Sequence, residues 1–143
     1  MKDVTSSEFL ARYERQMLLS GWGEAGQRRL AKSRVGVVGC GGLGGVAATH
    51  LVRAGVGFVR LIDADQVSLH NLHRQVLYAE KGTGSGQSKA EIAAARLAAM
   101  NSEVNVEVVP GLFQEAMGDA FAEGLDSSLM ARTTSPPGSP STG

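Results

Sequence analysis

Residues 35–44 constrain the fold of this chain more than any other stretch. They read Val-Gly-Val-Val-Gly-Cys-Gly-Gly-Leu-Gly, an apolar run that predicts a buried strand, followed by a cluster of glycines. Gly39, Gly41 and Gly44 have the spacing G-x-G-x-x-G. This spacing is typical of a tight turn into a helix whose first N–H groups suit an anion such as phosphate. The motif alone is weak evidence, because a tight turn without a ligand also requires glycine.

Each of these glycines has its own expected role. We expect Gly39 to let the chain leave the strand sharply, and Gly44 to let the helix pack closely on the strand. Gly41 and Gly42 have no Cβ, so a phosphate could approach their backbone. All four are therefore candidate nucleotide-binding residues.

Strand and helix patterns alternate along the rest of the chain. Two strands are predicted at residues 58–63 and 104–109, and two helices at residues 43–54 and 88–100. This alternation predicts a Rossmann-like α/β fold with three layers and a short, mainly parallel sheet. Further helices are predicted at residues 8–18, 25–32 and 112–123.

The chain divides into three parts on these patterns. Residues 1–33 are predicted to be an N-terminal helical arm, and residues 34–126 a nucleotide-binding, Rossmann-like domain. Nothing after Glu123 reads as an apolar strand, and residues 133–143 contain only Ser, Thr, Pro and Gly. We therefore expect residues 127–143 to form a disordered tail.

The composition of the chain excludes some classes of binding partner and some kinds of site. Lys and Arg number 14 and Asp and Glu number 14, so no net charge favours nucleic acid or an anionic membrane. The single cysteine, Cys40, excludes an internal disulfide and a paired-cysteine zinc site. No apolar run has membrane-spanning length, and the N-terminus does not resemble a secretory signal. We expect a soluble, cytoplasmic protein.

Acidic side chains follow the second predicted strand. Asp63 lies 19 residues after Gly44, close to where an acid contacts the ribose hydroxyls in nucleotide-binding βαβ units. Asp65 follows two residues later and is a second candidate. The alternative for Asp63 is a carboxylate that only caps a turn at the strand end.

Cationic and polar side chains come next. Asn71 and Arg74 lie beside the expected phosphate site, and an arginine can hold a phosphate through two hydrogen bonds. Lys89 begins the next helix, where its charge opposes the helix dipole, so we expect it to contact a phosphate. His70 and His73 have no partners at metal-ligand spacing, and no metal ligands are assigned. From its pattern alone, Arg15 lies on a solvated helix face.

Together these motifs resemble the ThiF/MoeB adenylyltransferases, which are relatives of the ubiquitin-activating enzymes. The resemblance covers about residues 8–109. The Asp-x-Asp motif followed by Asn-Leu-x-Arg-Gln is far more specific than the glycine turn. The matching segments, in the family's order, are residues 12–16, Gly26-Gln27, the glycine turn at 39–44, Ala54-Gly55-Val56-Gly57, residues 63–67, residues 71–75, Gly86-Gln87-Ser88-Lys89 and Asn101.

This resemblance implies a reaction, a cofactor and partners. Such enzymes use ATP and Mg²⁺ to adenylate the C-terminal carboxylate of a ubiquitin-like sulfur-carrier protein. Carried over by residue, Gly42 lines the nucleotide site and Asp63 holds the ribose. The phosphates are contacted by Asn71, Arg74 and Lys89. Arg15 matches an arginine that enters the partner subunit's site, which implies a homodimer and gives Arg15, Arg74 and Lys89 catalytic roles.

The end of the chain departs from the family pattern. The family continues with an apolar strand that ends in a magnesium-binding Asp, and then with a substrate-binding half. Here no such strand follows Glu123, and Asp126 has the wrong context to replace that acid. We therefore expect a truncated chain that is impaired as a catalyst.

Two alternatives to an adenylyltransferase remain open. One is a non-enzymatic remnant that only binds nucleotide or dimerises, which the missing metal ligand favours. The other is a NAD-type dinucleotide-binding module. Arg74 and Lys89 argue against the second alternative, because a dinucleotide has no terminal phosphate that needs such cations.

Overall fold

A parallel four-stranded sheet organises the chain. The computed structural model describes residues 6–131; residues 132–143 of the tail expected to be disordered lie outside them. The strands are β1 (Arg34–Val38), β2 (Phe58–Ile62), β3 (Asn105–Val108) and β4 (Ser127–Met130), in the spatial order β3-β2-β1-β4. All three strand pairings are parallel. The predicted Rossmann-like α/β fold is confirmed.

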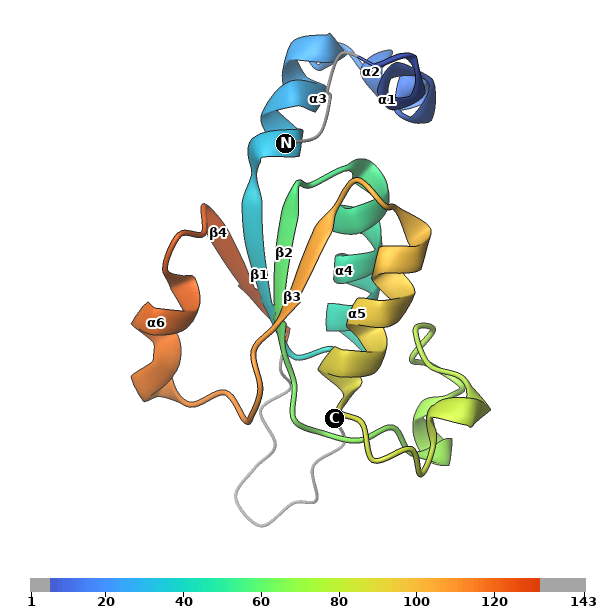
Figure 1. Ribbon diagram of the computed structural model, residues 1–143, viewed down its shortest axis with the longest axis vertical. Coiled ribbons are helices and arrows are strands. Elements are labelled where there is room, and N and C mark those ends of the chain that lie inside the picture. The colour runs from blue at the N-terminus through green and yellow to red at the C-terminus, as the bar shows by residue number, and fades with distance from the viewer. Residues whose placement is uncertain (1–5, 132–143) are drawn as a thin grey trace.

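Helices cover both faces of this sheet, which gives three layers (Figure 1). On one face lie α4 (Gly42–Ala54) and α5 (Lys89–Met100), and on the other η3 (Glu115–Met117) and α6 (Gly118–Ala122). Side chains of each strand alternate between these faces. Val37 belongs to the core under α4 and α5, whereas Val38 packs in a smaller cluster with Phe121 of α6.

Strand β4 contradicts the expectation that no strand follows Glu123 and that a tail begins at residue 127. It pairs with β1 from Val35↔Ser127 to Val38↔Met130. The strand has no buried face to reveal it, because Leu129 and Met130 are 41% and 55% exposed. Backbone hydrogen bonds to β1, rather than burial, therefore hold this strand in the sheet.

The helices outside the central βαβ unit also differ from the expected ranges. The helix predicted at residues 8–18 is divided at Tyr13 into α1 (Ser7–Arg12) and α2 (Glu14–Met17). The next helix, α3 (Gly23–Lys32), begins two residues before the predicted start. The helix predicted at residues 112–123 is a loop followed by η3 and α6. Two further 3₁₀ helices, η1 (Leu69–Asn71) and η2 (Glu80–Gly82), lie between β2 and α5.

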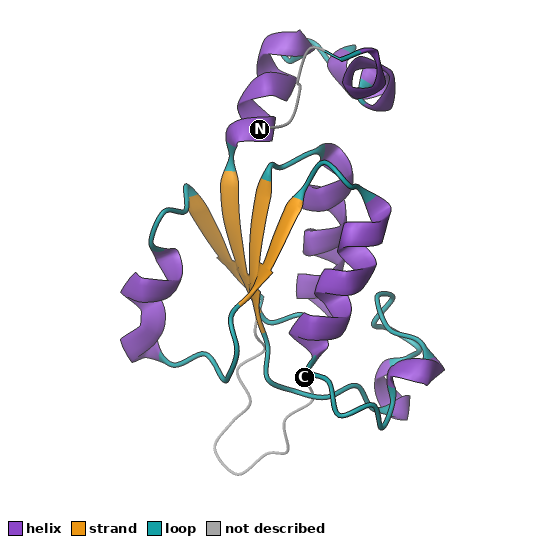
Figure 2. Cartoon of the chain, viewed as in Figure 1, coloured by secondary structure: helices purple, strands orange, loops and turns teal. Residues whose placement is uncertain are grey.

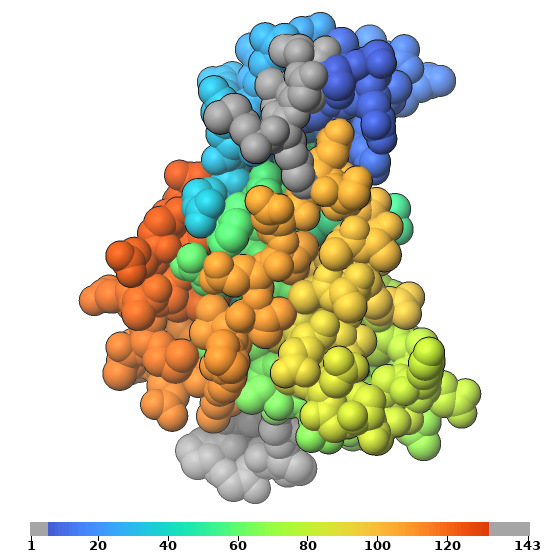
Figure 3. Space-filling model, in the orientation of Figure 1, coloured from blue at the N-terminus to red at the C-terminus, as the bar shows by residue number. Residues whose placement is uncertain are grey.

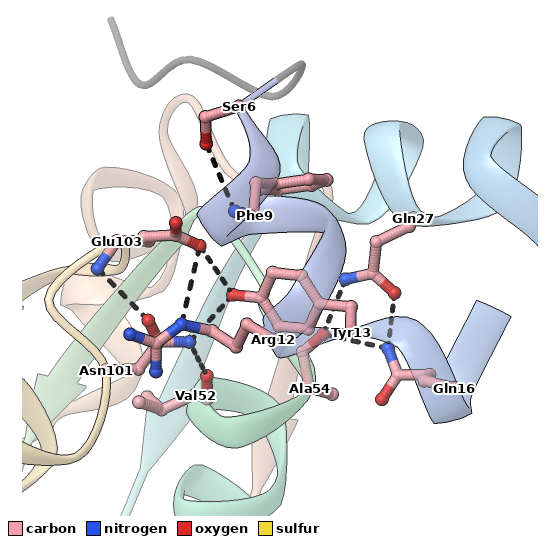
Figure 4. A network of polar contacts seen from close by, with 10 residues as sticks. All are labelled: Ser6, Phe9, Arg12, Tyr13, Gln16, Gln27, Val52, Ala54, Asn101 and Glu103. Carbon is pink, nitrogen blue, oxygen red and sulfur yellow. Dashed lines mark hydrogen bonds and ion pairs between the residues drawn. The ribbon is translucent and has the colours of Figure 1, made fainter.

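The N-terminal helices lie at the amino end of the sheet, away from the converging arrowheads of the strands (Figure 2). A polar cluster joins them to the rest of the fold (Figure 4). Asn101 Nδ2 donates to Tyr13 Oη at 2.8 Å and to the carbonyl of Val52 at 2.9 Å. Gln16 and Gln27 both donate to the carbonyl of Ala54, at 2.9 and 2.8 Å. These bonds satisfy buried groups at the end of α4.

None of the helices within residues 6–131 combines the length and the apolar character that crossing a membrane requires.

Two glycines set the passage from β1 into α4 as expected. Gly39 has φ +91°, a conformation that side chains with a Cβ rarely adopt. A Cβ on Gly44 would lie 1.7 Å from the carbonyl oxygen of Gly39, so the helix could not pack as it does. A Cβ on Gly42, by contrast, would meet nothing within 4 Å.

We predict that Gly44→Ala lowers the free energy of unfolding by at least about 2 kcal/mol, because backbone must move to admit the methyl group. Gly42→Ala, at the start of the same helix, is the matched control and should change stability by no more than about 1 kcal/mol. Urea unfolding followed by circular dichroism measures both. Equal stabilities for the two variants would contradict this packing.

The single cysteine lies in the core beside this turn. Cys40 is 0% exposed, and burial, together with the nearby charge of Asp63, raises the pKa of its thiol to about 12. The folded chain therefore holds the unreactive, protonated thiol.

We predict that a thiol reagent such as dithionitrobenzoate leaves the native chain unlabelled at pH 8 and labels one thiol per chain in denaturant. Because the folded pKa is raised, stability contributed by the protonated thiol is present at neutral pH and declines above about pH 8.5, the usual cysteine pKa. Rapid labelling of the native chain would show that the turn is open to solvent.

Candidate functional site

A cavity of about 830 Å³ lies at the carboxyl ends of β1 and β2, where ligands bind in folds of this kind. Its polar wall combines the glycine turn with acids and a cation from the segment after β2. Its residues are Val38, Gly39, Gly41, Gly42, Leu43, Ile62, Asp63, Ala64, Asp65, His70, His73, Arg74, Gln75, Leu112, Phe113 and Ala131.

Six of the predicted site residues line this cavity: Gly39, Gly41, Gly42, Asp63, Asp65 and Arg74. The other four do not. Gly44 packs α4 against the turn, and Asn71 and Lys89 are buried. Arg15 is exposed on α2, at the opposite end of the sheet (Figure 1).

The carboxylate of Asp63 holds the glycine turn in place. Its Oδ2 accepts a hydrogen bond from the N–H of Cys40 at 2.8 Å, and its Oδ1 accepts one from the N–H of Asp65 at 2.9 Å. Asp63 therefore does cap the turn at the strand end, which is the structural role given above as the alternative to a contact with ribose. A carboxylate oxygen has more than one lone pair, so these bonds leave it able to accept from a ligand hydroxyl.

Lys89 lies under the acidic wall of the cavity. The loop after β2 fixes the start of α5, because the N–H groups of Lys89 and Ala90 donate to the carbonyls of Asp65 and Asp63 at 2.7 and 3.4 Å. The Lys89 side chain is 1% exposed. Burial lowers its pKa, while the charges of Asp63 and Asp65 oppose that shift and Arg74 adds to it. Lys89 is thus close enough to both acids and to Arg74 to interact with their charges.

Asn71 and Arg74 are positioned by η1. Asn71 Oδ1 accepts from the N–H of Ser68 at 3.0 Å, so this side chain caps the 3₁₀ turn. Arg74 donates from one guanidinium nitrogen to the carbonyl of His70 at 3.0 Å, and this exposed residue lines the cavity. The cavity is thus lined by an exposed cation from the segment after β2 as well as by the glycine turn.

The cavity also has an apolar wall that the sequence analysis did not identify. Leu112 and Phe113 follow β3, and Leu43 comes from the first turn of α4. The carboxyl ends of parallel strands meet at one edge of the sheet. The position of Leu112 and Phe113 in the loop after Pro110-Gly111 could therefore have indicated that they line the cavity. Apolar and aromatic walls suit a heterocyclic base.

Within residues 6–131, no group of three or more His, Cys, Asp or Glu side chains lies together as a metal site would require. Asp126, the last acidic residue of the sequence, is at the far end of β4. Its Oδ2 accepts from the N–H of Arg34 at 2.8 Å, at the amino end of the sheet. It therefore lies away from the cavity, as its sequence context predicted.

The space-filling view agrees with this separation of the two ends (Figure 3). The blue N-terminal helices gather at one end, and the yellow-green segment before α5 lies toward the other.

Backbone donors, carboxylates, a cation and apolar side chains meet in the one cavity described above. Such a set can bind a phosphorylated molecule that carries a sugar and a base.

Comparison with known proteins finds similar relatives. The sulfur carrier protein adenylyltransferase of Thermus thermophilus is 48% identical over 105 residues, which are 73% of this chain and 38% of that protein. The adenylyltransferase and sulfurtransferase MOCS3 of Mus musculus is 45% identical over 121 residues, 85% of this chain and 26% of that protein. The chain thus spans about a quarter to two fifths of the length of these relatives.

Solved structures match as well. The tRNA N6-threonylcarbamoyladenosine dehydratase TcdA of E. coli has a TM-score of 0.83 and 30% identity, covering 92% of this chain and 54% of that one. A structure of TcdA in complex with ATP has a TM-score of 0.82 at 30% identity, covering 92% and 53%. The model of the ThiF family matches residues 13–131, most of the sequence. The ThiF/MoeB resemblance is confirmed, and the chain belongs to the ThiF family.

Proposed function

We propose that the cavity binds ATP and that the chain is the nucleotide-binding part of an adenylyltransferase acting on a ubiquitin-like sulfur-carrier protein. The observation that carries the proposal is the meeting of the glycine turn, Asp63 and Arg74 around one cavity, with Lys89 beneath it. The names of the relatives support the reaction, and the ATP complex of TcdA supports the nucleotide.

The cavity residues divide between the parts of ATP. The N–H groups at the start of α4, beginning with Gly42, have no partner within the helix and suit phosphoryl oxygens. Asp63 accepts from the ribose hydroxyls, with Asp65 beside it, and Leu112 and Phe113 contact the adenine. Arg74, which also lines the cavity, contacts the phosphates.

The chemistry requires charge neutralisation more than a base. The carrier's C-terminal carboxylate attacks the α-phosphorus of ATP, an acyl-adenylate forms, and pyrophosphate leaves. Arg74 and Lys89 stabilise the negative charge that develops on the phosphates. Binding of the anion also favours the charged form of Lys89, whose pKa burial lowers. Asn71 sets the position of Arg74, since its carbonyl accepts from the N–H of Arg74 at 3.2 Å.

Mg²⁺ is implied by the family resemblance. The described residues form no cluster of three or more metal-ligating side chains, and the aspartate that the resemblance implies has no counterpart among them. These residues do not fit a protein-held magnesium ion, so no step is assigned to one.

Arg15 acts in a homodimer under this proposal. It is exposed on α2, at the amino end of the sheet, whereas the cavity of its own chain lies at the carboxyl end (Figure 1). An arginine there reaches a nucleotide only in a second copy.

Nucleotide binding without turnover is the second candidate function. The chain spans 38% of the Thermus relative and 26% of the mouse relative, and the residues that the structure describes form no cluster of three or more metal-ligating side chains, which favours binding without turnover. Exchange of labelled pyrophosphate into ATP, dependent on added carrier protein, supports the adenylyltransferase. ATP binding without exchange supports the second candidate, and tight NAD binding without ATP binding supports a dinucleotide module.

We predict that Arg74→Ala and Lys89→Ala each weaken ATP binding about tenfold or more, because each removes a charge-assisted interaction with phosphate. Isothermal titration calorimetry measures the affinities. Arg29→Ala and Lys32→Ala, exposed on α3 at the opposite end of the sheet, are matched controls that should bind ATP normally. Wild-type affinity in both cavity variants counts against the assignment.

We predict that mixing Arg15→Ala chains with Arg74→Ala chains restores part of the exchange activity that each variant lacks. A mixed dimer contains one site with neither substitution, so up to half the activity of those dimers returns. Pyrophosphate exchange at varied mixing ratios provides the measurement. No recovery at any ratio would indicate that Arg15 is an ordinary surface residue.

A further inference from the structure

Tyr78 lies beneath the glycine turn and is not used in the function proposed above. It is 6% exposed and belongs to the main core with Cys40. Its hydroxyl donates to the carbonyl of Cys40 at 2.5 Å, and the carbonyl of Lys89 lies 3.4 Å from the same hydroxyl. Tyr78 thus joins the turn after β1 to the start of α5.

The two peptide groups that flank Cys40 are held from different directions. Asp63 Oδ2 accepts from the N–H of Cys40, which fixes the peptide between Gly39 and Cys40. Tyr78 donates to the carbonyl of Cys40, which fixes the peptide between Cys40 and Gly41. Neither Cys40 peptide group can rotate without loss of a buried hydrogen bond.

The second of these bonds sets the direction of a donor. The peptide between Cys40 and Gly41 is trans, so its carbonyl and its N–H point in opposite directions. The carbonyl points to the buried Tyr78, and the N–H of Gly41 therefore points away from the core. Gly41 lines the cavity.

We propose that Tyr78 is a positioning residue that aims the N–H of Gly41 into the cavity, where it donates to a phosphoryl oxygen of ATP. The inference rests on the proposed function, since it assumes that ATP occupies the cavity. Without the hydroxyl, the peptide can turn and its N–H no longer has a fixed direction. A preoriented donor binds an anion better because no reorganisation accompanies binding.

The hydroxyl remains a donor over the physiological pH range. Burial raises the pKa of Tyr78 far above its ordinary value, and the neighbouring Cys40 and Asp63 raise it further. The carbonyl of Cys40 therefore faces a neutral hydroxyl with a proton to donate.

The test compares the wild-type chain with Tyr78→Phe and Tyr13→Phe. Tyr13 is the other tyrosine of the sequence and is the matched control. Its hydroxyl donates to Glu103 at 3.0 Å and accepts from Asn101 at 2.8 Å, at the opposite end of the sheet (Figure 4). Both variants lose one buried hydroxyl, and only one of these lies beneath the glycine turn.

Affinities for ATP and for adenosine, measured by NMR titration, separate the two roles. We expect Tyr78→Phe to raise the dissociation constant for ATP about three- to tenfold and to leave that for adenosine unchanged. Tyr13→Phe should lower the melting temperature and bind both ligands as the wild type does. A Tyr78→Phe chain that binds ATP normally, or that loses ATP and adenosine affinity equally, overturns the inference.

A second measurement does not depend on the variant folding. In the ¹⁵N-labelled wild-type chain, the amide signal of Gly41 should shift on addition of ATP and should not shift on addition of adenosine. Absence of the ATP-dependent shift overturns the inference. A wild-type chain that binds no ATP contradicts the proposed function as well, whereas normal ATP binding by wild type and Tyr78→Phe contradicts only the role of Tyr78.

Discussion

The carboxylate of Asp63 is the interaction on which the rest of the site depends. One oxygen accepts from the N–H of Cys40 in the glycine turn, and the other accepts from the N–H of Asp65. The backbone carbonyls of Asp63 and Asp65 in turn accept from the first residues of α5. The Asp63 carboxylate therefore fixes the turn and the segment after β2, and the backbone of that segment holds the start of the helix that carries Lys89.

This arrangement explains how a small fold gathers groups from distant parts of the sequence. Parallel strands end at one edge of the sheet, so the loops after β1 and β2 must meet there. The N-terminal helices occupy the other end, where Asn101, Tyr13 and Gln27 bind them to α4. The two ends of the sheet thus have different roles. The amino end holds the N-terminal helices, and the carboxyl end places backbone donors and charged side chains around the cavity.

The sequence predicted the parts of this structure that follow from strict local rules. Only glycine satisfies the positive φ at Gly39 and the contact at Gly44, so the spacing identified the turn. The sequence did not predict β4, because the segment with Ser127 and Leu129 lacks the alternation of polar and apolar residues that marks a half-buried strand. Nor could it identify Tyr78, since a hydroxyl that binds a backbone carbonyl leaves no pattern of residues. Lys89 was expected at the site, but its burial depends on tertiary packing.

A crystal structure of the chain with ATP would show whether donors and cations from separate segments meet on one nucleotide. We expect phosphoryl oxygens within hydrogen-bond distance of the amides of Gly41 and Gly42, the ribose hydroxyls bound to Asp63, and the Arg74 guanidinium in contact with a phosphate. ATP bound outside this cavity, or bound there with its phosphates turned away from the glycine turn, would contradict this expectation.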